Sequence, residues 1–149
     1  MLFRSDLYCG IGKGLARANA AGAAALGVEL SGEAVDCARA NATGAEVLRG
    51  TCSQRLPQVD VWLAAHPAAR RLLAVNPPRS GLEPELRDWI AHAPPARASY
   101  LSCSAGSLAR DLAGLEAAGL RVVSLTPFDF FPQTQHVEVL ALLAASARP

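Results

Sequence analysis

The chain has 149 residues and a formal net charge of +1, and 51% of its residues are hydrophobic while 18% are charged. This composition excludes intrinsic disorder, which requires low hydrophobicity and high net charge, and the length suits one globular domain. No apolar run approaches the ~20 residues of a membrane span, and the N-terminus lacks the apolar core of a signal peptide. We therefore expect one cytoplasmic domain over residues 1–149.

Segments typical of strands and of helices alternate along most of the chain. We predict strands over residues 2–8, 25–30, 46–49, 72–75, 98–102, 120–125 and 136–144. The predicted helices cover residues 13–24, 31–42, 59–70, 84–92 and 104–118. The alternation predicts an α/β fold with a mostly parallel, Rossmann-like sheet and helices on both faces. Because no helix separates the last two strands, we expect that pair to be antiparallel.

The ends of the first two predicted strands carry the features of a nucleoside site. Ligands of such sheets bind beyond the carboxyl ends of the strands. A glycine-rich turn at residues 9–12 follows the first strand and permits close approach of the backbone to a ligand. Glu29 ends the second strand about 20 residues later, where a carboxylate accepts hydrogen bonds from ribose hydroxyls. The alternative is an ordinary tight turn followed by a solvated acid.

Two potentially reactive groups follow later in the chain. Cys103 lies between a predicted strand and a helix, and a helix N-terminus favours the thiolate form of a cysteine. Glu138 is the single charge in the apolar run 137–145, which we read as a buried strand. A buried carboxylate is costly unless it is paired or lies at the edge of a site. Alternatively, Cys103 is an inert core residue.

The loops near these groups add further candidates. Residues 76–81 end the fourth predicted strand, and the two prolines stiffen that loop. His136 lies two residues before Glu138 and either orients a substrate or caps the loop. The preceding phenylalanines either stack on a flipped base or anchor the loop, and they are Phe128, Phe130 and Phe131. The four cysteines have no metal-ligand spacing, so we predict no metal site.

Five segments together resemble the catalytic domain of the S-adenosylmethionine-dependent RNA (uracil-5-)-methyltransferases, which act on tRNA and rRNA. They are DLYCGIG at 6–12, GVE at 27–29, NPPRSGL at 76–82, SCSAGSLARDL at 102–112 and PFDFFPQTQHVEVLALL at 127–143. The first two are generic to class I methyltransferases, whereas the last two, following NPPR in this order, are specific. The resemblance covers nearly the whole chain and implies the class I methyltransferase fold.

The resemblance also implies roles for individual residues. It identifies Cys103 as the nucleophile and Glu138 as the general base of a reaction through a covalent adduct between the cysteine and uracil carbon-6. Carbon-5 of uracil becomes nucleophilic only after a thiolate adds at carbon-6, and its proton must leave before the thiol can. The implied contacts with S-adenosylmethionine are Tyr8, Gly10, Glu29 and Asn76. The expected contacts with the RNA substrate are Arg79, Phe131 and His136.

Some features favour other functions. The chain starts almost at the first predicted strand, whereas family members carry an N-terminal RNA-binding region, which we expect RNA docking to need. Lys13, Thr51 and Ser104 also depart from the residues usual in the family. These features favour a non-catalytic domain that binds a nucleoside or RNA. A third possibility is a small-molecule methyltransferase in which Cys103 has no role.

Overall fold

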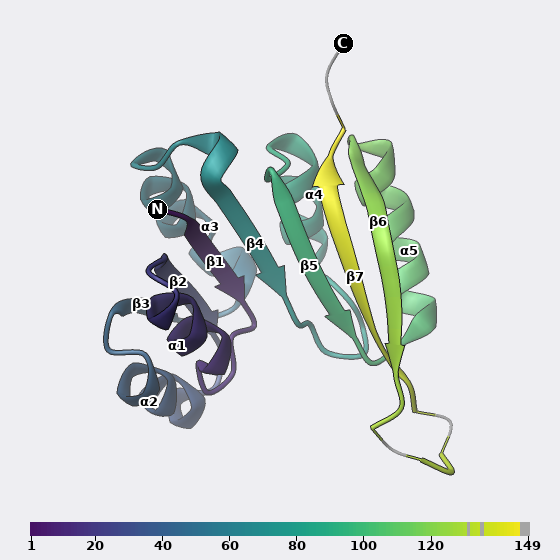
Figure 1. Cartoon of the computed structure of the whole chain (residues 1–149), viewed down its shortest axis with the longest axis horizontal. Coiled ribbons are helices and arrows are strands. Elements are labelled where there is room, and N and C mark those ends of the chain that lie inside the picture. The colour runs from purple at the N-terminus through teal and green to yellow at the C-terminus, as the bar shows by residue number, and fades with distance from the viewer. Residues whose placement is uncertain (131, 135, 147–149) are drawn as a thin grey trace. The chain divides into compact units, whose positions relative to one another are not determined.

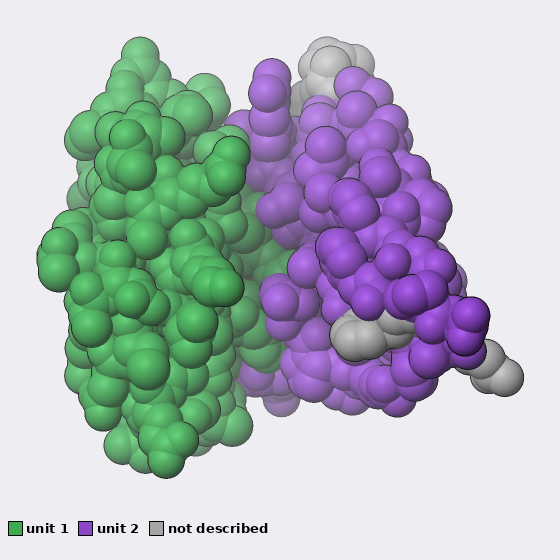
Figure 2. Space-filling model, turned by 60° about the horizontal axis from the view of Figure 1, so that its bottom comes forward, with its two compact units in different colours: residues 1–75 green, residues 76–149 purple. Residues whose placement is uncertain are grey.

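The computed structural model describes residues 1–130, 132–134 and 136–146 (Figure 1). The chain folds as two compact units, unit 1 over Met1–Val75 and unit 2 over Asn76–Pro149 (Figure 2). The sequence-based expectation of one domain over the whole chain stays a prediction. Among the described residues, no helix has both the length and the apolar character needed to cross a membrane.

Unit 1 is a parallel α/β arrangement. Its strands pair in the order β3-β2-β1-β4, and every pair is parallel. The strands are β1 (Phe3–Leu7), β2 (Ala24–Glu29), β3 (Ala45–Arg49) and β4 (Arg71–Val75). The helices are α1 (Lys13–Ala20), α2 (Gly32–Asn41) and α3 (Cys52–Ala64), followed by the short 3-10 helix η1 (Ala68–Arg70). Helices α1 and α2 cover one face of these strands and α3 covers the other (Figure 1).

The core of unit 1 fixes the positions at which its strands end. Leu7, Leu26 and Val28 are fully buried on the two central strands. Leu15 and Val35 on α1 and α2 belong to one buried apolar cluster that closes over the same sheet. Burial of such side chains contributes about 2 kcal/mol each. The carboxyl ends of β1 and β2 are therefore held side by side, as the predicted nucleoside site requires.

The helix predicted over residues 59–70 is wrong in its bounds. Helix α3 begins at Cys52, because Thr51 and Gln54 form a capping box: the Gln54 N–H donates to Thr51 Oγ1 at 3.1 Å and the Thr51 N–H donates to Gln54 Oε1 at 3.2 Å. The helix ends at Ala64, and only η1 continues the helical conformation further along. In contrast, the helix predicted to start at residue 31 is correct at that end, because Ser31 caps α2 by accepting from the Ala34 N–H at 3.4 Å.

Unit 2 has a different strand arrangement. Its strands are β5 (Arg97–Ser102), β6 (Leu120–Phe128) and β7 (Glu138–Ala145), in the order β5-β7-β6. The predicted antiparallel pair is confirmed, and β7 is antiparallel to β5 as well as to β6. Helices α4 (Pro84–His92) and α5 (Ala105–Ala117) lie on the same face of these strands (Figure 1).

The strand β7 is less buried than the sequence indicates. Ala141 and Leu143 face the helices and are buried, but Leu142 between them is 41% exposed. The prediction of a buried strand is therefore confirmed for one face of β7 only, because both helices of the unit cover the same face. The strand also begins at Glu138, so His136 precedes it rather than belonging to it. Glu138 itself is half-buried.

Candidate active site

The turn after β1 holds the first group of predicted site residues. Tyr8 has a φ of 65°, a left-handed conformation that is uncommon for a residue with a side chain. Gly10 and Gly12 also have positive φ values, and a side chain at Gly12 would meet the backbone of Ala38 on α2. Such strain is characteristic of functional turns. The backbone of the turn at Gly12 therefore packs directly against α2.

Glu29 is fixed at the end of β2 by two backbone groups. The Gly10 N–H donates to Glu29 Oε2 at 3.0 Å, and the Ser31 N–H donates to Oε1 at 2.9 Å. An ionised carboxylate accepts about four hydrogen bonds, so both oxygens retain capacity for a ligand. Nothing lies within 4 Å of the position that a side chain at Gly10 would take. An oriented acid beside an open glycine fits a ribose, and hence S-adenosylmethionine.

Cys9 lies in the same turn but is not a reactive thiol. Burial, together with the negative charges of Asp6 and Glu29, raises its pKa to about 12. Its sulfur packs against the backbone of Gly27, where a side chain would collide with it. At neutral pH this thiol is therefore protonated, and it is not a nucleophile because only the thiolate form attacks. The role of the Cys9 side chain is to pack against β2.

Cys103 lies in unit 2, directly after β5 and before Ser104, the N-cap residue of α5. The Ser104 N–H donates to Ser102 Oγ at 3.1 Å, and the Ser102 and Ser107 hydroxyls donate to the Ser104 carbonyl at 3.0 and 3.2 Å. These bonds close the chain tightly around Cys103. The side chain of Ser104 makes no capping hydrogen bond. Cys103 is half-buried.

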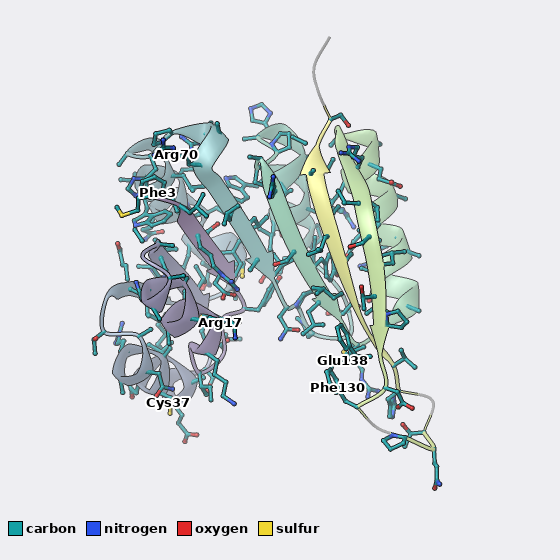
Figure 3. The ribbon with its side chains drawn as sticks, viewed as in Figure 1. Phe3, Arg17, Cys37, Arg70, Phe130 and Glu138 are labelled. Carbon is teal, nitrogen blue, oxygen red and sulfur yellow. The ribbon has the colours of Figure 1, made fainter. Side chains whose placement is uncertain are left out.

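The strand register brings Cys103 and Glu138 to the same end of unit 2. Ser102 of β5 lies opposite Val139 of β7, and Cys103 and Glu138 are the next residues on the two chains. On its other side Glu138 lies opposite Phe128, the last residue of β6. Figure 3 shows Glu138 at the start of β7 with Phe130 in the adjoining loop. A thiol and a carboxylate from separate segments therefore lie at the same end of these strands.

A cation and an imidazole lie beside this end. Arg79 Nη2 is 3.5 Å from His136 Nδ1, although the two residues are 57 positions apart in the chain. Both side chains are exposed. The contact joins the loop after β4 to the residues that lead into β7. Asn76, the residue directly after β4, is exposed as well.

Aromatic rings complete the surroundings of Glu138. The rings of Phe128 and Phe130 are stacked, with centroids 5.4 Å apart and planes inclined by 3°. Phe130 is 59% exposed, so one of its faces is open to a planar partner. Phe131, the other predicted contact with RNA, lies outside the described residues.

Sequence reasoning missed a buried charge, Asp111 of α5. Its side chain is fully buried and accepts hydrogen bonds from the Leu82 N–H and the Tyr100 hydroxyl, each at 2.8 Å. Arg87 and Arg110 form ion pairs with it at 3.4 and 2.8 Å. The sequence does contain a signal for it: Asp111 has the helical spacing of the apolar residues Leu108, Leu112 and Leu115, which form the buried face of α5. A lone acid on such an apolar face predicts a paired buried carboxylate.

These residues supply the components for covalent chemistry on a flat ring. They comprise a thiol, a carboxylate, a cation, an imidazole and an aromatic face, all in unit 2. Among the described residues, no group of three or more acidic, histidine or cysteine side chains is arranged to hold a metal ion. The arrangement suits nucleophilic addition by Cys103 and removal of a proton by Glu138.

Comparison with known sequences points to one family. A sequence model described as tRNA (uracil-5-)-methyltransferase matches residues 54–146. An uncharacterized RNA methyltransferase of Thermosynechococcus vestitus is 38% identical over 95% of this chain and 31% of its own length. The 23S rRNA (uracil(747)-C(5))-methyltransferase of Cronobacter sakazakii is 36% identical over 93% of this chain and 36% of its own length. The chain thus spans about a third of the length of these relatives.

Comparison with solved structures gives the fold. The tRNA (uracil-54, C5)-methyltransferase of Pyrococcus abyssi, crystallised with S-adenosyl-L-homocysteine, superimposes with a TM-score of 0.79 at 25% identity. The match covers 97% of this chain and 34% of that protein. An RNA methyltransferase of Salinibacter ruber, also bound to S-adenosyl-L-homocysteine, gives a TM-score of 0.60 over 99% of this chain at 15% identity. The predicted class I methyltransferase fold is confirmed.

Proposed function

Because the chain belongs to the tRNA (uracil-5-)-methyltransferase family, we propose that it transfers a methyl group from S-adenosylmethionine to carbon-5 of a uridine in RNA. The substrate is an rRNA or a tRNA, and we expect the reaction in the cytoplasm. The observation that carries the proposal is the register of β5 and β7, in which Cys103 and Glu138 occupy neighbouring strand ends. The register supports the proposal because the residues that correspond to the family's nucleophile and general base lie at the same end of the two strands.

In the proposed reaction Cys103 acts first. Its thiolate adds to carbon-6 of the uracil ring, and the electron pair of the 5,6 double bond moves to give an enolate with nucleophilic character at carbon-5. S-adenosylmethionine, when bound, would supply the methyl group that carbon-5 accepts, and with its sulfur–methyl bond broken it would leave as the neutral thioether S-adenosylhomocysteine. Glu138 then removes the proton from carbon-5, the 5,6 double bond forms again, and the sulfur of Cys103 leaves as thiolate. Atoms and charges balance, since one proton passes to Glu138.

The methyl donor is assigned to the turn after β1 and the end of β2. Glu29 would accept hydrogen bonds from both ribose hydroxyls, using the oxygen lone pairs that its backbone donors leave free. Gly10 would let the donor approach the backbone closely, and Tyr8 and Asn76 complete the expected contacts. The fit rests on the fixed orientation of Glu29 and the open space beside Gly10.

The RNA is assigned to the exposed residues around the start of β7 in unit 2. Arg79 is exposed and supplies a positive charge for a phosphate. His136 orients the nucleotide from beside Arg79. The open face of Phe130 provides a stacking surface for an extruded base, a recurrent device in enzymes that act on bases. The three contacts surround the strand end that carries Glu138.

A second candidate function is non-catalytic binding of a nucleoside or RNA. It is favoured by Thr51, which occupies a position where class I enzymes often have an acid near the adenine. In this chain Thr51 is engaged in the capping box of α3. Such a domain would retain Glu29 and Arg79 as binding groups but would form no covalent bond with RNA. A covalent trap therefore separates the two functions.

The test uses RNA that contains 5-fluorouridine together with S-adenosylmethionine. Fluorine at carbon-5 cannot leave as a proton, so an enzyme using the proposed route stays joined to the RNA. We expect a covalent protein–RNA complex on a denaturing gel, with the attachment mapped to Cys103 by mass spectrometry. Cys103→Ala should abolish it, whereas Cys37→Ala, which removes an exposed thiol of α2, should not. Attachment at another residue, or no complex with RNA that the chain binds, contradicts the proposal.

A further inference from the structure

The carboxylate of Asp111 joins three segments of unit 2. Oδ2 accepts one bond from the Leu82 N–H in the loop after β4 and one from the Tyr100 hydroxyl on β5. Oδ1 faces Arg110 on α5 itself and Arg87 on α4. Both oxygens are thus engaged, one by neutral donors and one by cations. A buried carboxylate is tolerated when it is satisfied in this way.

Arg110 reaches beyond Asp111 to the loop. Its Nη2 atom donates to the Ser80 carbonyl at 2.8 Å while it also donates to Asp111 Oδ1 at 2.8 Å. Between these anchors Gly81 has a φ of 86°, and a side chain there would collide with both Arg110 and Asp111. The Gly81 N–H also closes a turn onto the Pro78 carbonyl at 2.9 Å. Ser80, Gly81 and Leu82 are therefore each held by α5 or by the turn.

The loop fixed in this way carries Arg79. Arg79 immediately precedes the Ser80 carbonyl that Arg110 binds, and its guanidinium lies 3.5 Å from His136. Because the Arg79 side chain is long and exposed, its position depends on the backbone from which it extends. Losing the bond to Ser80 would free that backbone without removing any group that contacts RNA.

We propose that Arg110 is a positioning residue that, through Ser80 and Asp111, holds Arg79 beside His136 where RNA binds. The inference rests on the proposed function, because it is the RNA contact of Arg79 that gives the arrangement its purpose. Arg87 provides a matched control. It bears the same charge and pairs with the same carboxylate, yet it makes its contact from α4 and is not bonded to Ser80.

The first measurement is hydrogen exchange of the loop amides in the intact chain. In Arg110→Ala we expect the amides of residues 80–82 to exchange about tenfold faster, because a backbone anchor is lost. In Arg87→Ala the same amides should exchange as in the unmodified chain. Arg110 is half-exposed, and in its absence Asp111 keeps its partners Leu82, Tyr100 and Arg87. Equal exchange in the two variants would overturn the proposal.

The second measurement is kcat/KM for methylation of a short oligouridylate. We expect Arg110→Ala to lower it about tenfold and Arg79→Ala to lower it about a hundredfold. The double variant should be no worse than Arg79→Ala alone, since Arg110 acts through Arg79. Losses that multiply in the double variant would show that Arg110 acts through general stability, which contradicts the proposal.

The two measurements separate failure of the inference from failure of the function. If the unmodified chain binds the oligouridylate but never methylates it, the proposed function fails and Arg110 loses its role in catalysis. Binding of the same oligouridylate then replaces kcat/KM, with the same non-additivity expected between Arg110 and Arg79. If methylation occurs and the loop amides respond equally to both arginine variants, the function stands and the positioning role is refuted.

Discussion

The two units prepare their site residues in different ways. In unit 1 the groups at the strand ends belong largely to the backbone: a strained Tyr8, a glycine turn, and Glu29 fixed by two N–H groups. In unit 2 they are side chains set by register and by a buried ionic network around Asp111. Under the proposed function, unit 1 binds the nucleoside part of the methyl donor and unit 2 supplies the two reacting groups.

The buried charges show the same contrast. In unit 1 Asp6 is paired with Arg4 at 3.0 Å, but burial still raises the pKa of Asp6 above its ordinary value. In unit 2 burial and the hydrogen bond to Asp111 raise the pKa of Tyr100, which keeps its hydroxyl a donor. The unit 1 pair links two positions on one strand, whereas the unit 2 network links a loop, two helices and a strand. Unit 2 therefore depends more on specific polar contacts.

The largest expected difference concerns two glycines with positive φ. Gly81→Ala in unit 2 should lower the free energy of unfolding by about 2–5 kcal/mol, the sum of backbone strain and collision with Arg110 and Asp111. Gly10→Ala in unit 1 should cost only about 1–2 kcal/mol, because its side chain would meet no atom within 4 Å. Urea unfolding of both variants checks this, and equal losses would refute the contrast.

The next effect concerns binding in unit 1. Glu29→Ala should weaken binding of S-adenosylmethionine by about 2–4 kcal/mol, because two charge-assisted hydrogen bonds to the ribose are lost. Isothermal titration calorimetry measures the change. Arg110→Ala is a suitable comparison, since it alters unit 2 and should leave this affinity close to its original value. Unchanged affinity in Glu29→Ala would remove that residue from the cofactor site.

The smallest effect is a pH dependence from Cys9 in unit 1. Its pKa is raised from 9.0 to about 12 in the folded chain, so the unfolded chain releases this proton first as pH rises. The stabilisation is fully present below pH 9 and is lost between pH 9 and about 12. Urea unfolding across that range should show a shallower loss in Cys9→Ser, by less than about 1 kcal/mol per pH unit since the thiol is only partly buried. Identical slopes would contradict the assignment.

The sequence predicts the parts of this molecule that rest on periodicity and local chemistry. The helix from Pro84 to His92 is predicted at its observed bounds, because proline marks the first turn and the apolar spacing is regular. The start of α3 was missed although Thr51 and Gln54 stand at capping-box spacing, and the observed helix includes Pro57. Local signals locate the ends of helices less well where no proline or capping residue is recognised: the helix predicted over residues 13–24 ends at Ala20.

The site was less accessible to sequence reasoning. Glu138 attracted attention as a lone acid in an apolar strand and is only half-buried, whereas the fully buried acid is Asp111 on helix α5. The contact between Arg79 and His136 could not be predicted, because it depends on how two distant loops fold. Roles for Cys103 and Glu138 came from resemblance to a family, and strand register alone then gave them a shared location.

The central claim is that Cys103 and Glu138 act in sequence on one uridine, and the variant Glu138→Gln tests it most directly. We expect this variant to add to unmodified RNA and to transfer the methyl group, but to stall before the carbon-5 proton leaves. Mass spectrometry of the denatured mixture should then show protein joined to RNA that carries one extra methyl group, attached at Cys103. Normal turnover by Glu138→Gln, or methylation that persists in Cys103→Ala, would contradict the mechanism.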